Sequence, residues 1–157
     1  MFNTWLHLVA LVVLLGAIVG FWLIFLPSLS TLRNHEERSR FLALGLKFYN
    51  PLQIGALGIV LFTGAFQLTD LKAAYREMFI KQLGFALAVK LTLAFFLVIF
   101  CVYQSMGIGH RFVRRYEGGE RATPQELASI IKRLSSATWI ILFLAALTLW
   151  FGLRLRA

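Results

Sequence analysis

The chain has 157 residues, of which 59% are hydrophobic and 15% are charged, and its mean hydropathy is +0.76. This composition excludes an ordinary water-soluble domain, in which about 25% of the residues are charged. The net charge of +9 does not indicate a nucleic-acid partner, because 15 of the 16 Lys and Arg residues lie outside the long apolar stretches or at their margins, as they do in membrane proteins.

Four apolar stretches predict four membrane-spanning helices, because about 18 to 20 apolar residues cross about 30 Å of hydrocarbon as a helix. The predicted spans are residues 5–26, 51–68, 83–103 and 134–153. We therefore expect an all-α integral membrane protein that forms a single four-transmembrane-helix bundle over residues 1–157. The first stretch is longer than the apolar core of a secretory signal and has no Lys or Arg before it, so we expect it to be retained.

Prolines mark the connection between the first two spans. Pro27 is predicted to end the first helix, because proline lacks the N–H that continues a helix. The pattern of residues 28–49 then indicates an amphipathic connection. Asn50 and Pro51 are favourable residues at a helix start, so they predict the beginning of the second span.

Another helix start is predicted between the third and fourth spans. Residues 117–120, Glu-Gly-Gly-Glu, indicate a turn, and Thr123 with Glu126 three residues later has the pattern of a capping box. A helix is expected to run from Pro124 into the fourth span.

The distribution of basic residues predicts the orientation in the membrane. Residues 27–50 carry four Lys and Arg and residues 104–133 carry six, whereas residues 69–82 carry three and the C-terminal tail carries two. Since basic residues favour the cytoplasmic side, we expect both termini on the outer face of a multi-pass protein in the cell inner (cytoplasmic) membrane.

Lys90 is the single charge within the third apolar stretch, where a lysine costs about 2.5–3.5 kcal/mol on insertion scales. One interpretation is that the side chain snorkels to the interface, over about 10 Å at helical rise. A buried ion pair has no obvious partner, because the four predicted spans contain no Asp or Glu. The third interpretation is an uncharged amine that acts as a metal ligand or as a base.

His7 lies near the start of the first span, about 7 Å below the helix start at helical rise and therefore at a depth similar to that of Lys90. Taken alone, it is as well explained as an interfacial histidine. Ala94 removes bulk one helical turn from Lys90, and Thr63 and Gln67 lie at the same level in the second span, where they either bond a ligand or join helices. Helix bundles hold cofactors between such ligands.

Other candidates carry weaker signals. Cys101 shares a helix face with Lys90 but lies about 16 Å deeper, so we expect it to pack rather than to share a metal. Gly16 and Gly20 form a GxxxG pattern that favours contact with another helix or subunit. His35 and His110 have no further His, Cys or carboxylate at metal-site spacing, and we expect them to be solvated or lipid-facing.

Several short motifs are shared with a known group of membrane proteins. They are Trp5-Leu6-His7-Leu8, Leu26-Pro27, Asn50-Pro51, Thr63-Gly64 and Ala88-Val89-Lys90-Leu91. From residue 5 to about residue 103 the sequence resembles the CopD-type superfamily, which includes the HemJ-type protoporphyrinogen oxidases. The resemblance implies a helical bundle in which His7 and Lys90 ligate a b-type haem.

The chain departs from the HemJ-type pattern at three places. It has Ser28 where those sequences tend to carry an arginine, Gln104 where they carry a histidine, and Leu-Ser-Ser-Ala at residues 134–137 in place of an Asn-Glu-x-Pro signature. These departures favour a role in electron transfer over the oxidation of protoporphyrinogen.

The leading hypothesis is a b-type haem-binding membrane protein that serves in electron transfer, since two nitrogen ligands leave no open position on the iron. We expect a quinone or a protein as its redox partner, within a homo-oligomer or a larger membrane complex. Three alternatives stay open: a HemJ-like protoporphyrinogen oxidase, a CopD-like copper transport or tolerance module, and a structural subunit in which Lys90 snorkels.

Overall fold

The computed structural model describes residues 1–74 and 83–154, which are 93% helical and contain no strand. They form four long helical rods. The first contains α1 (Phe2–Gly20), η1 (Phe21–Phe25) and α2 (Leu26–Thr31); the second is α3 (His35–Ala74); the third contains α5 (Leu83–Val102), η2 (Tyr103–His110) and α6 (Arg111–Glu117); the fourth is α7 (Pro124–Arg154). Each rod is long and apolar enough to cross a membrane, which confirms the predicted four-helix membrane fold.

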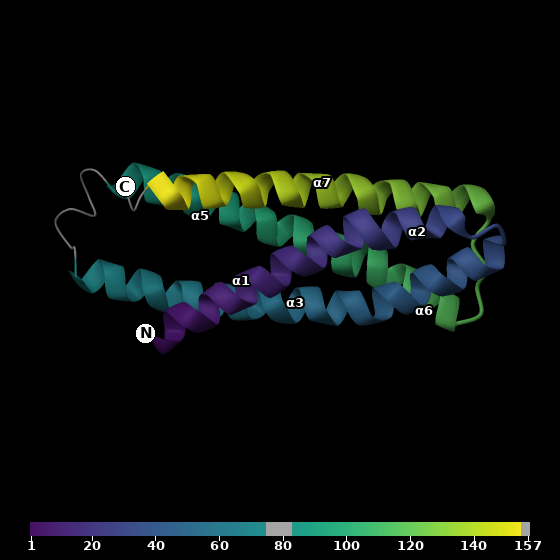
Figure 1. Cartoon of the computed structure of the whole chain (residues 1–157), viewed down its shortest axis with the longest axis horizontal. Helices are drawn as coiled ribbons and strands as arrows, with labels where there is room; N and C mark the ends of the chain where they lie inside the picture. The colour runs from purple at the N-terminus through teal and green to yellow at the C-terminus, as the bar shows by residue number, and fades with distance from the viewer. Residues whose placement is uncertain (75–82, 155–157) are drawn as a thin grey trace.

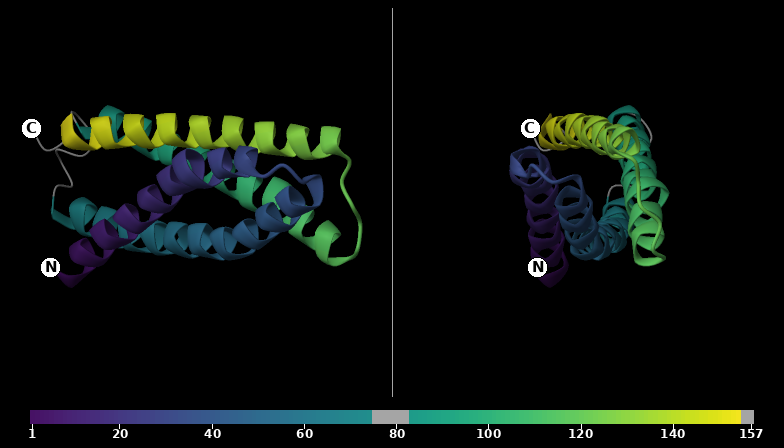
Figure 2. Two further views of the ribbon diagram at one scale, coloured as in Figure 1. Left: turned by 45° about the vertical axis from the view of Figure 1, so that its right-hand side comes forward. Right: turned by 90° about the vertical axis from the view of Figure 1, so that its right-hand side faces the viewer.

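The rods pack as two pairs (Figure 1). α1 packs along α3, and α5 packs along α7. α1 begins and α7 ends at the same end of the bundle, which we call the termini end. The opposite end is called the loop end, because residues 32–34 and 118–123 connect the rods there. The first rod runs diagonally: it begins beside α3 at the termini end and reaches the side of α7 at the loop end, as Figure 2 also shows.

The prediction that Pro27 ends the first helix is wrong. The backbone of Leu26 stays helical (φ −63°, ψ −44°), and α2 continues to Thr31 before Leu32 becomes extended. A stretch of π-helix over Phe21–Phe25 precedes the proline. The wider π turn accommodates the proline ring, which would otherwise meet the carbonyl group four residues earlier.

The prediction that a helix starts at Asn50 and Pro51 is also wrong. α3 begins at His35, where the Asn34 side chain accepts a hydrogen bond from the backbone N–H of Glu36 (3.1 Å), and Pro51 lies inside it. The residues predicted as an amphipathic connection are therefore mostly helix. A long membrane helix that packs on its neighbours tolerates the bond that an internal proline removes.

The start of α7 is as predicted. The Thr123 hydroxyl accepts a hydrogen bond from the backbone N–H of Glu126 (3.2 Å), and the Glu126 carboxylate accepts one from the N–H of Thr123 (3.3 Å). The preceding turn uses Gly119 at φ +86°, a backbone conformation that favours glycine. The capping box and the turn predicted from the sequence are confirmed.

The half of the bundle nearest the loop end is tightly packed. Fully buried leucines from three rods meet there, including Leu29, Leu42 and Leu134. The Phe21 ring stacks on the Tyr49 ring, with 4.2 Å between centroids, and Tyr49 is buried. Deeper in the bundle, Cys101 is fully buried in a second apolar cluster with Leu14, Ile18 and Ile141, in line with the packing role predicted for it.

The half nearest the termini end is packed much less tightly. In residues 1–9, 64–70, 84–100 and 146–154, no side chain is buried. Contacts between the α1/α3 pair and the α5/α7 pair concentrate in the other half. The inward faces at the termini end are therefore half-buried at most.

Candidate functional site

The His7 side chain of α1 docks onto α3 at the termini end. Its Nδ1 atom lies 2.7 Å from the Thr63 hydroxyl oxygen, and its ring packs beside Gly64, where an added Cβ would stand 3.4 Å from the His7 Cε1 atom. Asn3 reinforces the contact one turn earlier, since its amide donates to the carbonyl oxygen of Thr63 (3.3 Å). The predicted proximity of His7 and Thr63 is thus a direct contact between two helices.

Two carbonyl groups of α3 also lie within reach of the Thr63 hydroxyl. The hydroxyl oxygen lies 2.6 Å from the Ile59 carbonyl oxygen and 3.2 Å from that of Val60, and both of these groups only accept. If the hydroxyl gives its single hydrogen to one of these carbonyls, it accepts a hydrogen bond from His7 Nδ1. With the hydrogen on Nδ1, the Nε2 atom keeps its lone pair, which is the state of a metal-ligating histidine.

Lys90 lies on the inward face of α5. The residues on this face are half-buried and are followed along the helix by the fully buried Cys101; they are Lys90, Ala94 and Leu97. The residues on the outward face, Leu91 and Phe95, are exposed. The Lys90 side-chain nitrogen reaches α7, where a Cβ added to Gly152 would stand 3.4 Å from Nζ. The structure thus brings both predicted nitrogen donors to the termini end of the bundle.

Gln67 and Ala94 complete the set of residues predicted for this site. Gln67 follows Thr63 by one turn on α3 and is half-buried; its Nε2 atom is enclosed and has no hydrogen-bond partner among residues 1–74 and 83–154. A buried donor without an acceptor is costly, so an acceptor from a ligand or a water molecule would stabilise it. Ala94 has a small side chain, so it leaves space on the same face of α5 one turn after Lys90.

The donor set suits haem better than a metal ion held by protein ligands alone. In the part of the chain that the structure describes, no three His, Cys, Asp or Glu side chains come together, and the site offers one imidazole and one amine. Haem brings four nitrogen ligands of its own and requires one or two axial ligands from the protein. The half-buried inward faces and the unpartnered Gln67 amide are compatible with a ligand between the two helix pairs.

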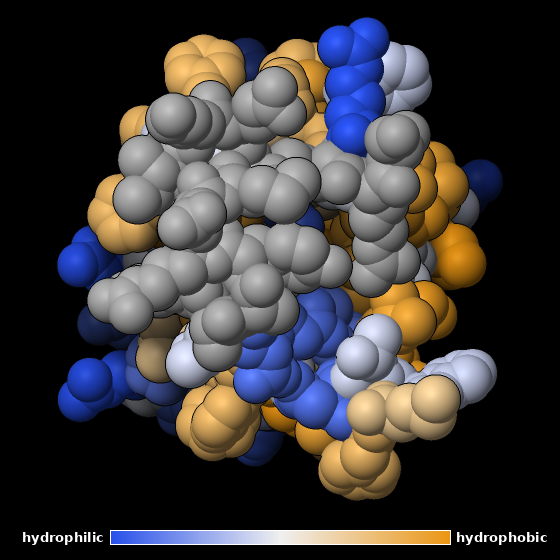
Figure 3. Space-filling view, turned by 90° about the vertical axis from the view of Figure 1, so that its left-hand side faces the viewer, coloured by the Kyte–Doolittle hydropathy of each residue, from blue (hydrophilic) through white to orange (hydrophobic). Residues whose placement is uncertain are grey.

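The surface of the termini end is mixed in polarity (Figure 3). Hydrophilic side chains gather in the lower part of this view, and apolar side chains lie on both sides of them.

A buried polar network that sequence reasoning missed lies in the middle of the bundle. Gln53 donates to the side-chain oxygen of Gln104 (3.0 Å), and the Gln104 amide donates to the Thr138 hydroxyl (2.5 Å). All three side chains are at most 1% exposed, and they join α3, η2 and α7. The π-helix η2, a rare element that is frequent at functional sites, carries Gln104.

The two remaining histidines lie outside the candidate site. His35 was expected to be solvated or lipid-facing, but it is half-buried, and its Nε2 atom lies 2.7 Å from the Ala122 carbonyl oxygen. It therefore ties the start of α3 to the loop before α7. His110 is exposed at the end of η2, as expected.

Comparisons of the chain with models of protein families, with curated proteins and with solved structures find no match. The interpretation of the site accordingly depends on its geometry and on the chemistry of its donors.

Proposed function

We propose that the chain is a membrane protein that binds b-type haem between His7 and Lys90 at the termini end of the bundle and serves in electron transfer. The observation that supports this proposal is the 2.7 Å contact between His7 Nδ1 and the Thr63 hydroxyl, which engages one ring nitrogen and leaves Nε2 outside that bond. Lys90, whose Nζ atom lies beside Gly152 at the same end of the bundle, is the second donor of the proposal in its uncharged form. Second-shell bonds of this kind fix the orientation of a ligating ring and raise its basicity.

The residues around the site favour electron transfer over catalysis at the iron. With His7 and Lys90 as its two protein ligands, a haem would supply a one-electron couple and would offer no position for a substrate. Thr63 and Asn3 hold the His7 segment of α1 against α3, and α5 packs directly along α7. These contacts would keep the two nitrogen donors in place in either oxidation state of a bound haem.

The orientation in the membrane is part of the proposal. The loop end carries ten of the fifteen basic residues that lie outside the predicted spans, so we place it in the cytoplasm and both termini on the outer face of the inner membrane. The haem then lies near the outer face. A quinol or a partner subunit is the proposed source of electrons.

Two of the three alternatives, the HemJ-like oxidase and the copper module, have no comparable contact in their favour. Gln104, at the position of a histidine in HemJ-type sequences, bonds Gln53 and Thr138 in the closed interior of the bundle. Copper handling would draw on the same two nitrogen donors, with no additional sulfur ligand, since Cys101 lies in the buried apolar cluster.

The proposal is tested by the haem and metal content of the purified chain. We expect about one b-type haem and one iron per chain by the pyridine haemochrome assay and elemental analysis, and loss of most of the haem in Lys90→Ala. Lys47→Ala is the matched control, because Lys47 forms an exposed ion pair with Glu117 at the loop end (2.8 Å) and should not affect haem. Copper in place of iron, or unchanged haem content in Lys90→Ala, would contradict the proposal.

A further inference from the structure

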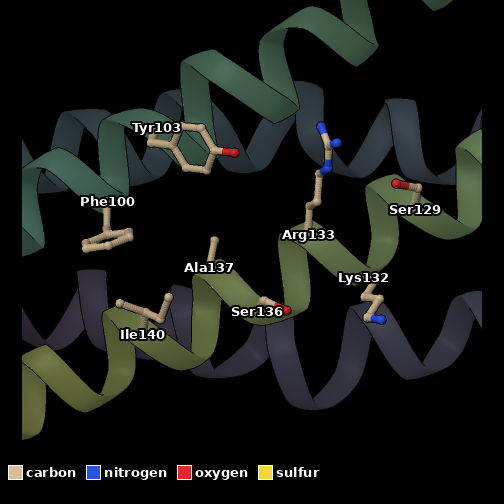
Figure 4. A pocket seen from close by; sticks show the side chains of 8 residues that line it. All are labelled: Phe100, Tyr103, Ser129, Lys132, Arg133, Ser136, Ala137 and Ile140. Atoms are coloured by element: carbon tan, nitrogen blue, oxygen red, sulfur yellow. The ribbon is translucent and has the colours of Figure 1, made fainter.

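A groove lies between α7 and the junction of α5 with η2. It has a volume of about 340 Å³. The residues that matter for its chemistry are Phe100, Tyr103, Ser129, Arg133, Ala137 and Ile140 (Figure 4). The groove therefore runs from near the loop end to the middle of the bundle, and none of the residues proposed to bind haem lines it.

The groove changes in polarity along its length. Ser129, Arg133 and Ala137 follow one another at a spacing of four residues, so they line one face of α7. The polar members lie toward the loop end, and Ala137 with Ile140 lies toward the middle of the bundle, about 16 Å from Ser129 to Ile140 at helical rise. Phe100 and Tyr103 repeat this order on the facing helix, since Tyr103 is nearer the loop end.

The polar part of the groove is positively charged. The side chains of Arg133 and Tyr103 both extend into the space between the two helices, whereas Lys132 points to the other side of α7 (Figure 4). No Asp or Glu lines the groove, and within the described ranges neither Arg133 nor Lys132 forms an ion pair. An arginine in this setting offers a planar pair of donors that matches a phosphate group.

We propose that this groove binds an anionic phospholipid. Its phosphate lies against Arg133, with the hydroxyl groups of Tyr103 and Ser129 as further donors, and its acyl chain lies along Ala137, Ile140 and Phe100. The order of polarity in the groove is that of a lipid in a bilayer, with the headgroup at the basic end and the chain toward the midplane. Basic pockets between membrane helices on the cytoplasmic side are suited to anionic headgroups. The inference is independent of haem binding.

The test measures lipid bound to the full-length chain by native mass spectrometry, with equal amounts of phosphatidylglycerol and phosphatidylcholine. We expect preferential retention of phosphatidylglycerol, and about fivefold weaker binding of this lipid by Arg133→Gln. Arg114→Gln is the matched control, because Arg114 is exposed on α6 at the same end and outside the groove. It should bind the lipid as the unaltered chain does.

A second pair of variants tests the apolar part of the groove. Ile140→Trp fills it and should weaken phosphatidylglycerol binding, whereas Leu149→Trp should not, although both side chains are 40% exposed on α7. Equal retention of the two lipids, equal effects of Arg133→Gln and Arg114→Gln, or displacement of the bound lipid by millimolar inorganic phosphate would overturn the proposal. The last result would indicate a site for small anions.

Discussion

The two halves of the bundle differ in what holds the helices together. Near the loop end, fully buried side chains such as Leu42 and Leu134 fill the space between the rods. Near the termini end, no side chain of residues 1–9, 64–70, 84–100 or 146–154 is buried, and hydrogen bonds such as that between His7 and Thr63 join the helices. The comparison indicates that one half stabilises the fold and the other carries the polar groups of the candidate site.

The largest effect is expected from His7→Ala, which should abolish haem binding while leaving the helical fold intact. His7 belongs to neither buried cluster, so its removal leaves the packing of the loop half unchanged. The absorbance of the purified variant measures the haem, and circular dichroism measures the helix content. His35→Ala is the control: it removes a histidine that bonds the Ala122 carbonyl and should retain haem.

Replacing a leucine should lower the free energy of unfolding much more in the loop half than in the termini half. Leu134→Ala opens a cavity at a fully buried position of the loop half, and we expect a loss of about 2–5 kcal/mol in the free energy of unfolding. Leu91→Ala, at a position 47% exposed in the termini half, should change it by about 0.5 kcal/mol or less. Titration with a denaturing detergent provides the measurement. Similar losses in the two variants would remove the distinction between the halves.

Thr63→Val sharpens the comparison within the candidate site, because it removes the hydroxyl that accepts from His7 and preserves the size of the side chain. We expect haem affinity to fall about 10- to 100-fold, as for other second-shell changes. Haem titration into the apoprotein measures this affinity. Thr63→Ser retains the hydroxyl and should bind nearly as the unaltered chain does; an equal loss in both variants would point to packing in place of hydrogen bonding.

The smallest effect is expected for Gln104→Leu, which breaks the polar network in the middle of the bundle. Hydrogen bonds between membrane helices contribute about 0.6 kcal/mol on average and about 1.7 kcal/mol at most. We therefore expect a loss of that order in the free energy of unfolding, with haem content unchanged. Loss of haem in this variant would show that the network and the termini half are coupled.

The four spans and the level of the site followed from composition and helical rise. Apolar length determines how many helices cross a bilayer, and counting residues placed His7 and Thr63 at one depth, where they now form a hydrogen bond. The helix boundaries predicted at Pro27 and Pro51 were wrong, because rules for helix ends describe local preference. In a membrane, the helix continues through a proline because neighbouring helices and the hydrogen bonds along the rest of the helix stabilise it.

The buried network could not be predicted in the same way. Gln53 and Gln104 are single uncharged amides 51 positions apart, and no spacing rule links them. Their pairing depends on how α3 packs against η2, a π-helix that no sequence pattern predicted. Likewise, the burial of Tyr49 arises from its stacking on Phe21, a contact between two rods.

The account depends most on the pair of axial ligands, and electron paramagnetic resonance of the ferric protein tests it most directly. The unaltered chain should give a single low-spin signal, because two nitrogen ligands impose a strong ligand field, and both His7→Ala and Lys90→Ala should lose that signal. A high-spin signal from the unaltered chain, or a low-spin signal that survives in Lys90→Ala, would contradict ligation between His7 and Lys90.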